Sequence, residues 1–172
     1  MKRNQLILAA ASTLVFALGN AQAQDAAKPA AAKPPTNDWL LEAPDDTERF
    51  RRLQQYLRGF DQPMWEVGDR WAGLHEALKR DNFDLAIYHW DKIKTTIENG
   101  YLKRPARRAN SDAVLFNSGV FAQVRTAFES RNRAKAWEGF AAARAACMTC
   151  HEAEKVAYMN NQPLLDLAGP AK

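Results

Sequence analysis

Apolar side chains recur at steps of three and four positions from residue 46 almost to the end of the chain, and this spacing constrains the fold most. It places these side chains along one face of an α-helix. No segment shows the alternation that a half-buried strand requires. The fold class is therefore predicted to be all-α, an antiparallel four-helix bundle preceded by a short additional N-terminal helix. The helices are expected at about 47–59, from 62 to a turn at 81–82, from that turn to 100, at 111–130 and at 133–159.

Turn-forming residues indicate where these helices should begin and end. Asn99-Gly100 is expected to close the third helix. Ser111 is expected to cap the fourth, and Asn117-Ser118-Gly119 is expected to divide that helix into two pieces. The last helix is expected to continue to Met159, before Pro163 stops it. These limits place the most unusual motif of the chain within the last helix.

That motif is Cys147-Met148-Thr149-Cys150-His151, which has the pattern of a c-type haem attachment site. Each thiol can form a thioether with a haem vinyl group, and the imidazole of His151 can then be an axial iron ligand. A dithiol redox pair would require a βαβ context, which the chain does not show. Half of a zinc site would need further ligands, and only His75 and His89 remain. The motif predicts one covalently attached haem c.

The first 23 residues have the pattern of a cleaved secretory signal peptide. Lys2 and Arg3 precede an apolar run from Leu6 to Leu18, and Ala21-Gln22-Ala23 is a small-residue cleavage site. The apolar run is too short for a membrane span, and no later run is long enough to cross a bilayer. The mature protein is therefore expected to be soluble and exported. In a bacterium its location would be the periplasm, where haem c is attached.

The remaining charge and composition exclude one class of partner and define the domains. The whole chain carries 24 Lys+Arg against 20 Asp+Glu, and the signal holds two of the basic residues and no acidic one. The mature chain therefore has 22 basic against 20 acidic residues, which gives no reason to expect nucleic-acid binding. Residues 24–45 are predicted to be a disordered linker, because 24–38 is rich in Ala, Pro and Lys. Residues 46–172 then form the haem-binding helical domain.

The position of the motif predicts where the second iron ligand should lie. His151 follows Phe140 by eleven residues, about three helical turns, so both should point to the core. In an up-down bundle the first turns of the helix starting near residue 62 lie beside the end of the last helix. Met64 lies there, on the apolar face, and is the candidate distal ligand. The alternative is that Met64 only fills the core. His75 is eleven residues further on, about 16 Å along the axis, and too far away.

These features together resemble the class II c-type cytochromes, meaning cytochrome c prime and its low-spin relatives. The resemblance covers roughly residues 62–160 and depends on the signal, the helical pattern and the single attachment motif near the C-terminus. It implies a distal position that holds either a methionine or an apolar residue that leaves the iron open. The family usually has arginine four residues after the ligand histidine. This chain has Lys155 there, which retains a positive charge beside the haem but cannot form a bidentate contact.

Short segments add to this resemblance. The chain is similar to exported c-type proteins of this type at Arg58-Gly59-Phe60-Asp61, at Met64-Trp65-Glu66-Val67-Gly68 and at Lys103-Arg104-Pro105. The helix at 47–59 lies outside the four-helix template. A loop at 102–108 should lie at the haem end of the bundle. Its basic residues are a solvated surface, partners of the haem propionates or a docking patch for an acidic redox protein. They are Lys103, Arg104, Arg107 and Arg108.

The sequence therefore predicts a periplasmic mono-haem cytochrome that carries single electrons between redox partners. It shows no catalytic triad, phosphate loop or paired carboxylates, so it is not expected to be an enzyme and no catalytic residue is assigned. The alternative function is a five-coordinate protein that binds NO or CO, as cytochrome c prime does. A peroxide-consuming enzyme is a third and weaker interpretation. The redox partner is unidentified, and the sequence leaves open whether the protein forms a homodimer.

Overall fold

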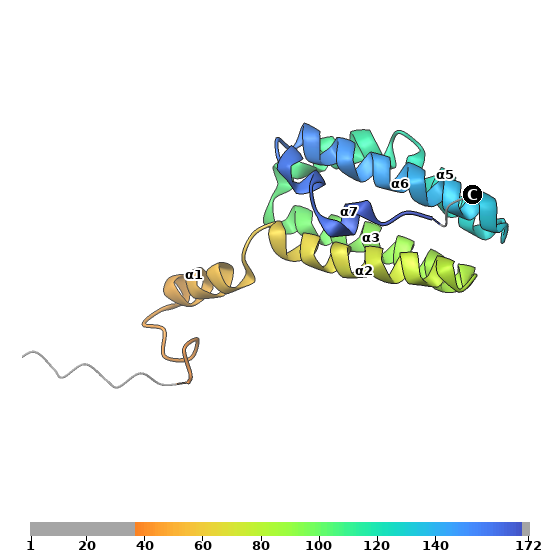
Figure 1. The fold of residues 1–172 in the computed structure, drawn as a ribbon. Coiled ribbons are helices and arrows are strands. Elements are labelled where there is room, and N and C mark those ends of the chain that lie inside the picture. Colours follow the sequence, from red (N-terminus) through yellow and green to blue (C-terminus); the bar gives the residue numbers. More distant parts are fainter. Residues whose placement is uncertain (1–36, 170–172) are drawn as a thin grey trace, which may run out of the picture. The chain divides into compact units, whose positions relative to one another are not determined.

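The computed structural model describes residues 37–169, and all regular secondary structure in that range is helical, as predicted (Figure 1). The predicted signal, residues 1–23, and residues 24–36 of the predicted linker lie outside the described range. The longer helices are α1 (Asp46–Leu57), α2 (Asp61–Lys79), α3 (Phe83–Lys103), α5 (Val120–Glu129) and α6 (Arg133–Ala153). The shorter ones are η1 (Pro105–Arg107), α4 (Arg108–Ser111), η2 (Asp112–Phe116), η3 (Ala157–Asn160) and α7 (Pro163–Asp166).

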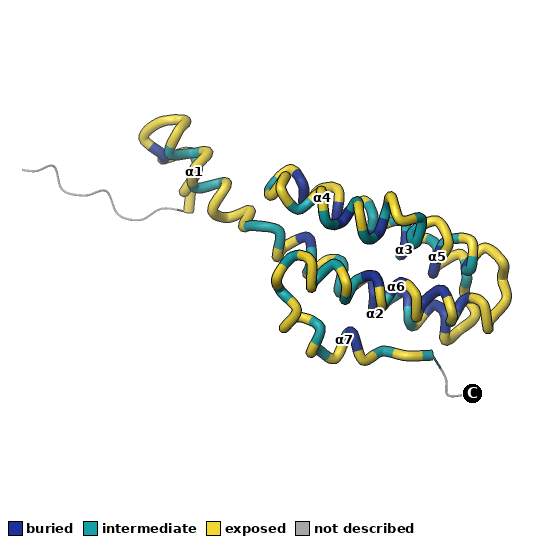
Figure 2. The backbone as a smooth tube through the Cα atoms, turned by 90° about the horizontal axis from the view of Figure 1, so that it is seen from above, coloured by how far each residue is buried: buried dark blue, intermediate teal, exposed yellow. Residues whose placement is uncertain are grey.

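The longer helices from α2 onward are arranged as two hairpins. α2 packs along α3, and α5 packs along α6, each pair joined by a turn of three residues (Figure 1). Between the hairpins, α3 contacts α5 and α2 contacts α6, so their apolar faces meet in one core. The buried positions recur at helical spacing along these helices (Figure 2). The segment between α3 and α5 supplies the short helices η1, α4 and η2.

The two hairpin turns lie together at one end of this arrangement. Asp81 and Arg131 each have a positive φ, 54° and 52°, which ends the preceding helix. The next residue in each turn is an asparagine whose side chain caps the following helix. Arg133 pairs with Asp81 at 2.6 Å, and Arg131 pairs with Asp84 at 2.5 Å. The start of α2 and the end of α6 consequently lie at the opposite end.

Stacked aromatic side chains form much of the core. Trp71 stacks on Phe140 with ring centroids 4.1 Å apart, and Trp90 stacks on Phe121 at 4.8 Å. The indole N–H of Trp71 donates to the carbonyl of Leu164 at 2.8 Å, and that of Trp90 donates to the carbonyl of Phe121 at 3.0 Å. Neither buried donor is therefore left unpaired. The predicted apolar faces of α2, α3 and α5 are confirmed as core. In α6 the prediction is confirmed at Phe140, whereas Trp137 is half-buried and Ala141, expected on the same face, is exposed. The buried core residues include Trp71, Leu74, Leu78, Ala86, Trp90, Ile93, Ile97, Leu115, Val124, Phe128 and Phe140.

The third helix is longer than predicted, because Gly100 does not end it. α3 continues to Lys103. A Cβ at Gly100 would lie 2.5 Å from the ring of Phe60, so the glycine admits this ring against the helix. The helix ends before Pro105, whose ring disfavours helical conformation at Arg104, and Arg104 has φ −145° and ψ 76°.

The fourth predicted helix begins earlier than expected and is divided as expected. Ser111 does not cap it, because this residue is buried within the helical segment and its hydroxyl donates to the carbonyl of Arg107 at 2.7 Å. The backbone N–H of Asn117 donates to the carbonyl of Asp112 at 2.6 Å, which gives η2 its wide π-type turn. The predicted interruption is confirmed at Gly119, where φ is 85°. Helix α5 begins at the next residue, Val120.

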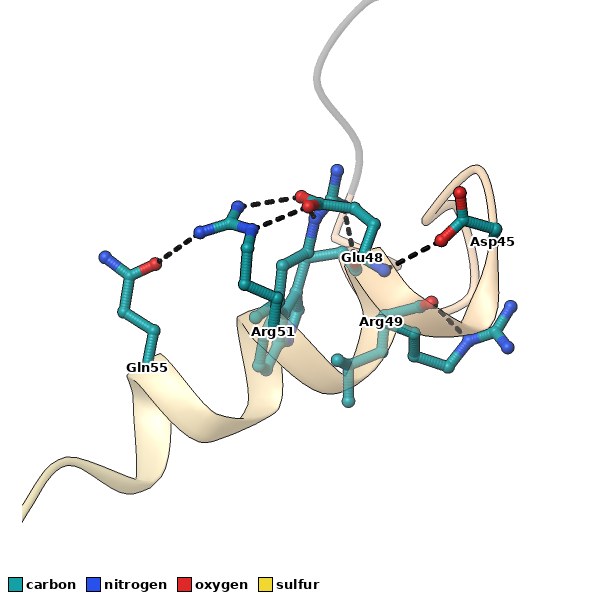
Figure 3. Close-up of polar contacts among 8 residues, drawn as sticks. Asp45, Glu48, Arg49, Arg51 and Gln55 are labelled. Carbon is teal, nitrogen blue, oxygen red and sulfur yellow. Dashed lines mark hydrogen bonds and ion pairs between the residues drawn. The ribbon is translucent and has the colours of Figure 1, made fainter.

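α1 is the predicted additional helix, and polar contacts connect it to the turn before it. The carboxylate of Asp45 accepts from the backbone N–H of Glu48 at 2.8 Å, and Arg51 donates to the Glu48 carboxylate at 2.6 Å (Figure 3). Arg49 donates to the carbonyl of Leu40 at 3.0 Å, within the stretch predicted as linker. No residue of α1 is buried, so its apolar residues are not part of the core.

No helix within residues 37–169 is both long enough and apolar enough to cross a membrane. The two longest, α3 and α6, have 21 residues each, and both carry charged residues along their length. Their buried hydrophobic residues belong to the shared core.

Candidate functional site

The attachment motif lies in the last two turns of α6, on the continuation of its buried face. Phe140, Ala143 and Ala146 of this helix are buried in the core. Cys150 and His151 follow Cys147 by three and four residues, a spacing that places all three side chains on one face of the helix. Both thiols and the imidazole are half-buried. The helix thus presents two sulfur atoms and one imidazole together, next to the core.

The thiols are in an environment that keeps them uncharged. Burial raises the pKa of Cys147 to about 12. Burial also raises the pKa of Cys150, with a further contribution from the negative charge of Glu154 and an opposing one from Arg107. Reactive redox dithiols have the opposite property, because their chemistry needs a thiol with a lowered pKa. The surroundings of this pair therefore do not favour the dithiol interpretation.

The imidazole of His151 is oriented by Asn160. Its Nδ1 lies 2.8 Å from the side-chain oxygen of Asn160. The amide nitrogen of Asn160 donates to the carbonyl of Met148 at 3.2 Å, which assigns the oxygen, an acceptor, to the histidine side. Nδ1 must then donate, and in the neutral imidazole this leaves the lone pair of Nε2 free. The donor set fits a covalently held haem, since two thiols and an imidazole with a free Nε2 share one face.

α6 ends earlier than predicted, and this brings Asn160 to the motif. The helix ends at Ala153, not at Met159, because Lys155 has a left-handed φ of 60°. The N–H of Val156 donates to the carbonyl of His151 at 2.9 Å, and the N–H of Lys155 donates to that of Glu152 at 3.0 Å, which together form a Schellman motif. The chain then turns back against α6 as η3.

The same helix end changes the position of Lys155. The resemblance implies a basic residue one helical turn beyond the ligand histidine. Lys155 instead follows the C-cap of α6, has non-helical backbone and is exposed. The helical relation of Lys155 to His151 is therefore absent, and a contact with haem propionates stays a prediction.

A polar cluster connects the segment after α3 to the end of α6, as the expected position of this loop requires. Arg107 forms an ion pair with Glu154. The amide of Asn110 donates to Glu154 at 2.9 Å and to the carbonyl of Ala153 at 3.3 Å. Glu154 is the C-cap residue of α6 and its side chain is only 14% exposed. Arg107 is therefore a structural partner of the motif's helix.

The other basic residues of this segment differ in exposure. Lys103 is half-buried as a residue, and its ammonium group donates to the carbonyl of Leu57 at 2.7 Å. Arg104 and Arg108 are exposed. The guanidinium carbon of Arg108 lies 4.4 Å from the ring centroid of Tyr101. Of the four charges in the loop, Arg104 and Arg108 are thus the two most open to solvent.

Met64 lies in the first turn of α2 and is half-buried against the core. One turn earlier, the ring of Phe60 packs on Tyr101 with centroids 6.4 Å apart, and the Arg107 guanidinium lies 5.9 Å from the Phe60 ring centroid. Arg107 in turn pairs with Glu154. This series of contacts places the start of α2 and the end of α6 at the same end of the domain. Ligation by Met64 stays a prediction.

The remaining histidines have other surroundings. The Nε2 atom of His75 lies 3.0 Å from the carbonyl oxygen of Ala168. The ring centroids of His75 and Trp137 are 5.5 Å apart. His89 packs against Gly73, and its Nδ1 is buried without a hydrogen-bond partner. Nowhere in residues 37–169 do three or more His, Cys, Asp or Glu side chains gather as a metal site would require.

Sequence reasoning did not identify two of the residues that surround the motif, Asn160 and Glu154. The contact of Asn160 depends on the turn at Lys155, and the contacts of Glu154 depend on the segment after α3. No local pattern in the sequence signals either. Comparisons with protein-family models, with curated proteins and with solved structures find no match for this chain.

Proposed function

We propose that this chain is an exported mono-haem c-type cytochrome that carries single electrons between redox partners. The observation that carries this proposal is the arrangement of Cys147, Cys150 and His151 on one face at the end of α6, with Nε2 of the histidine free. Thioethers at the two cysteines and the His151 imidazole would hold the group. When bound, haem c supplies an iron that accepts and releases one electron. The signal-like sequence at residues 1–23 supports export to the periplasm.

The proposal includes an antiparallel four-helix bundle formed by α2, α3, α5 and α6. Two hairpins with short turns, packed against each other through four apolar faces, support this architecture. In such a bundle, side chains on facing helices form the cofactor site. Helix α6 contributes the attachment motif, and α2 contributes Met64 from its first turn. The domain would hold the macrocycle between these two helix ends.

Whether Met64 binds the iron distinguishes the two proposed functions, electron transfer and gas binding. A thioether on the distal side would complete the coordination of the iron and exclude external ligands, which suits an electron carrier. An apolar distal residue would leave the iron open, which suits the alternative, a five-coordinate protein that binds NO or CO. The position of Met64, half-buried at the same end of the domain as the motif, favours the first function.

The experiment that tests the proposal is an optical spectrum of the purified holoprotein, oxidised, reduced and reduced with carbon monoxide. We expect the spectra of a low-spin haem c in both redox states, with no change on adding carbon monoxide. A high-spin spectrum that changes at once with carbon monoxide would support the gas-binding alternative. A protein without haem absorption would contradict both functions.

A second prediction concerns the surface for an acidic redox partner. Arg104 and Arg108 are exposed at the motif end, whereas Arg107 is held by Glu154. Changing Arg104 and Arg108 together to glutamate should slow reduction by an anionic reagent and accelerate reduction by a cationic one. The effect on the association rate should be about tenfold at low salt. It should fade at about 0.1 M salt, where the Debye length is about 10 Å.

Stopped-flow reduction with an anionic and a cationic metal complex measures this effect. The matched control reverses two exposed basic residues at the opposite end, Arg80 and Lys135, which gives the same change in net charge. If both double variants change the rates equally, the effect reports overall charge alone and Arg104 and Arg108 are not a docking surface.

A further inference from the structure

We propose that Asn160 is a positioning residue for the haem ligand His151, holding the imidazole in one tautomer and one orientation and setting its strength as an electron donor to the iron. This inference rests on the proposed function, in which Nε2 of His151 binds the iron. It assigns a role to a residue that lies outside the attachment motif, nine positions after the histidine.

The hydrogen bonds of Asn160 allow only one tautomer of His151. The amide has its oxygen 2.8 Å from Nδ1 of His151 and its nitrogen 3.2 Å from the carbonyl oxygen of Met148. If the amide were flipped, its oxygen would face the Met148 carbonyl, and two acceptors would then oppose each other. The unflipped amide offers only an acceptor to the imidazole. Nδ1–H must donate, and in the neutral imidazole Nε2 is left with its lone pair available for a metal.

The backbone around Asn160 is built to hold this contact. The left-handed residue Lys155 reverses the chain at the end of α6, and Val156 donates back to the carbonyl of His151 at 2.9 Å. The N–H of Met159 then donates to the carbonyl of Val156 at 2.8 Å, which closes η3. Asn160 is the last residue of this short helix and is half-buried against α6. The acceptor is therefore in place next to the imidazole.

The identity of the acceptor should affect the electronic properties of the ligand. A metal-binding histidine generally donates its other N–H to an acceptor that fixes the ring and raises its basicity. A neutral amide oxygen pulls on this proton less than a carboxylate does. A carboxylate in its place would make the imidazole a stronger donor and stabilise the oxidised iron, and an apolar side chain would do the opposite. The potential of the bound haem should therefore follow the residue at position 160.

The test compares the holoproteins of Asn160→Asp and Asn160→Leu with the wild type. We expect the midpoint potential to fall in Asn160→Asp and to rise in Asn160→Leu. The iron–histidine stretching frequency, measured by resonance Raman spectroscopy on the ferrous five-coordinate form in a Met64→Ala background, should rise and fall respectively. A role in packing alone would not produce shifts of opposite sign in the two variants.

Asn161→Asp is the matched control, because Asn161 is the next residue, is exposed and would receive the same charge. If Asn160→Asp shifts the potential no more than Asn161→Asp does, the positioning role is wrong. If Asn160→Leu does not fold, the comparison of Asn160→Asp with Asn161→Asp still tests the positioning role.

A readout without haem separates this inference from the proposed function. If the wild-type chain carries no haem, the proposed function fails, and the tautomer of His151 can still be read from imidazole ¹⁵N chemical shifts in the full chain. The wild type should show the Nδ1–H form, whereas Asn160→Leu should return to the Nε2–H form that neutral imidazole favours in water. An Nε2–H tautomer in the wild type would overturn the inference.

Discussion

Mature protein from cells with a cytochrome c maturation system should carry one haem that remains attached after denaturation and acid–acetone extraction. The physical reason is that two thioether bonds, formed at Cys147 and Cys150, would hold the haem whether or not the chain is folded. Replacing both cysteines with alanine should remove all extraction-resistant haem. Mass spectrometry of the denatured chain measures the result directly. Replacing one cysteine should leave a single thioether and a smaller yield of covalent product.

Thr149→Ala is the matched control for this experiment. Thr149 lies between the two cysteines, is exposed, and its hydroxyl donates only to the carbonyl of Ala145 at 3.0 Å. This variant should retain covalent haem at the level of the wild type. A wild-type mass without haem, or haem that is lost on denaturation, would remove the basis of the proposed function. Equal loss in Thr149→Ala and the double cysteine variant would instead indicate a general defect in folding or maturation.

The sequence was informative about the core because each helix carries its own apolar spacing. The stripe through Trp90 and Ile93 identified α3, and the stripe through Val124 and Phe128 identified α5, without reference to any other element. The errors arose where a residue's conformation depends on a distant neighbour. Glycine is a residue type that commonly ends a helix. Gly100 instead lies within α3, where the missing side chain leaves room for the ring of Phe60, the residue before α2.

The candidate site likewise has one part that the local sequence predicts and one part that depends on distant residues. The motif at Cys147 to His151 is local, and any helix through it places the three side chains on one face. The end of that helix is not local. Nothing in the sequence marks Lys155 as a residue with positive φ, because lysine rarely adopts this conformation and the apolar pattern continues beyond it. Without that turn the contact of Asn160 with His151 could not be inferred.

Met64→Ala should convert a low-spin ferric protein into a high-spin one that binds carbon monoxide readily when reduced. The wild type should show the near-infrared methionine–iron charge-transfer band, and the variant should lack it. Met64 is half-buried in the first turn of α2, at the end of the domain where α6 carries His151. In the proposed site, removing the thioether would remove the sixth ligand and open the distal side. Absorption and near-infrared spectra of the two proteins, with and without carbon monoxide, measure the change.

Two further variants separate ligation from packing. Truncation of a fully buried methionine to alanine costs about 2–5 kcal/mol, so the cost at the half-buried Met64 should lie toward or below the lower end of this range, and a volume-conserving change to leucine usually costs less than about 1.5 kcal/mol. Met64→Leu should therefore retain the core and still become high-spin, because leucine has no sulfur. Met159→Ala, at an exposed methionine near the motif, should remain low-spin. If the wild type is already high-spin and neither Met64 variant differs from it, Met64 is a core residue and the gas-binding function is the better account of the site.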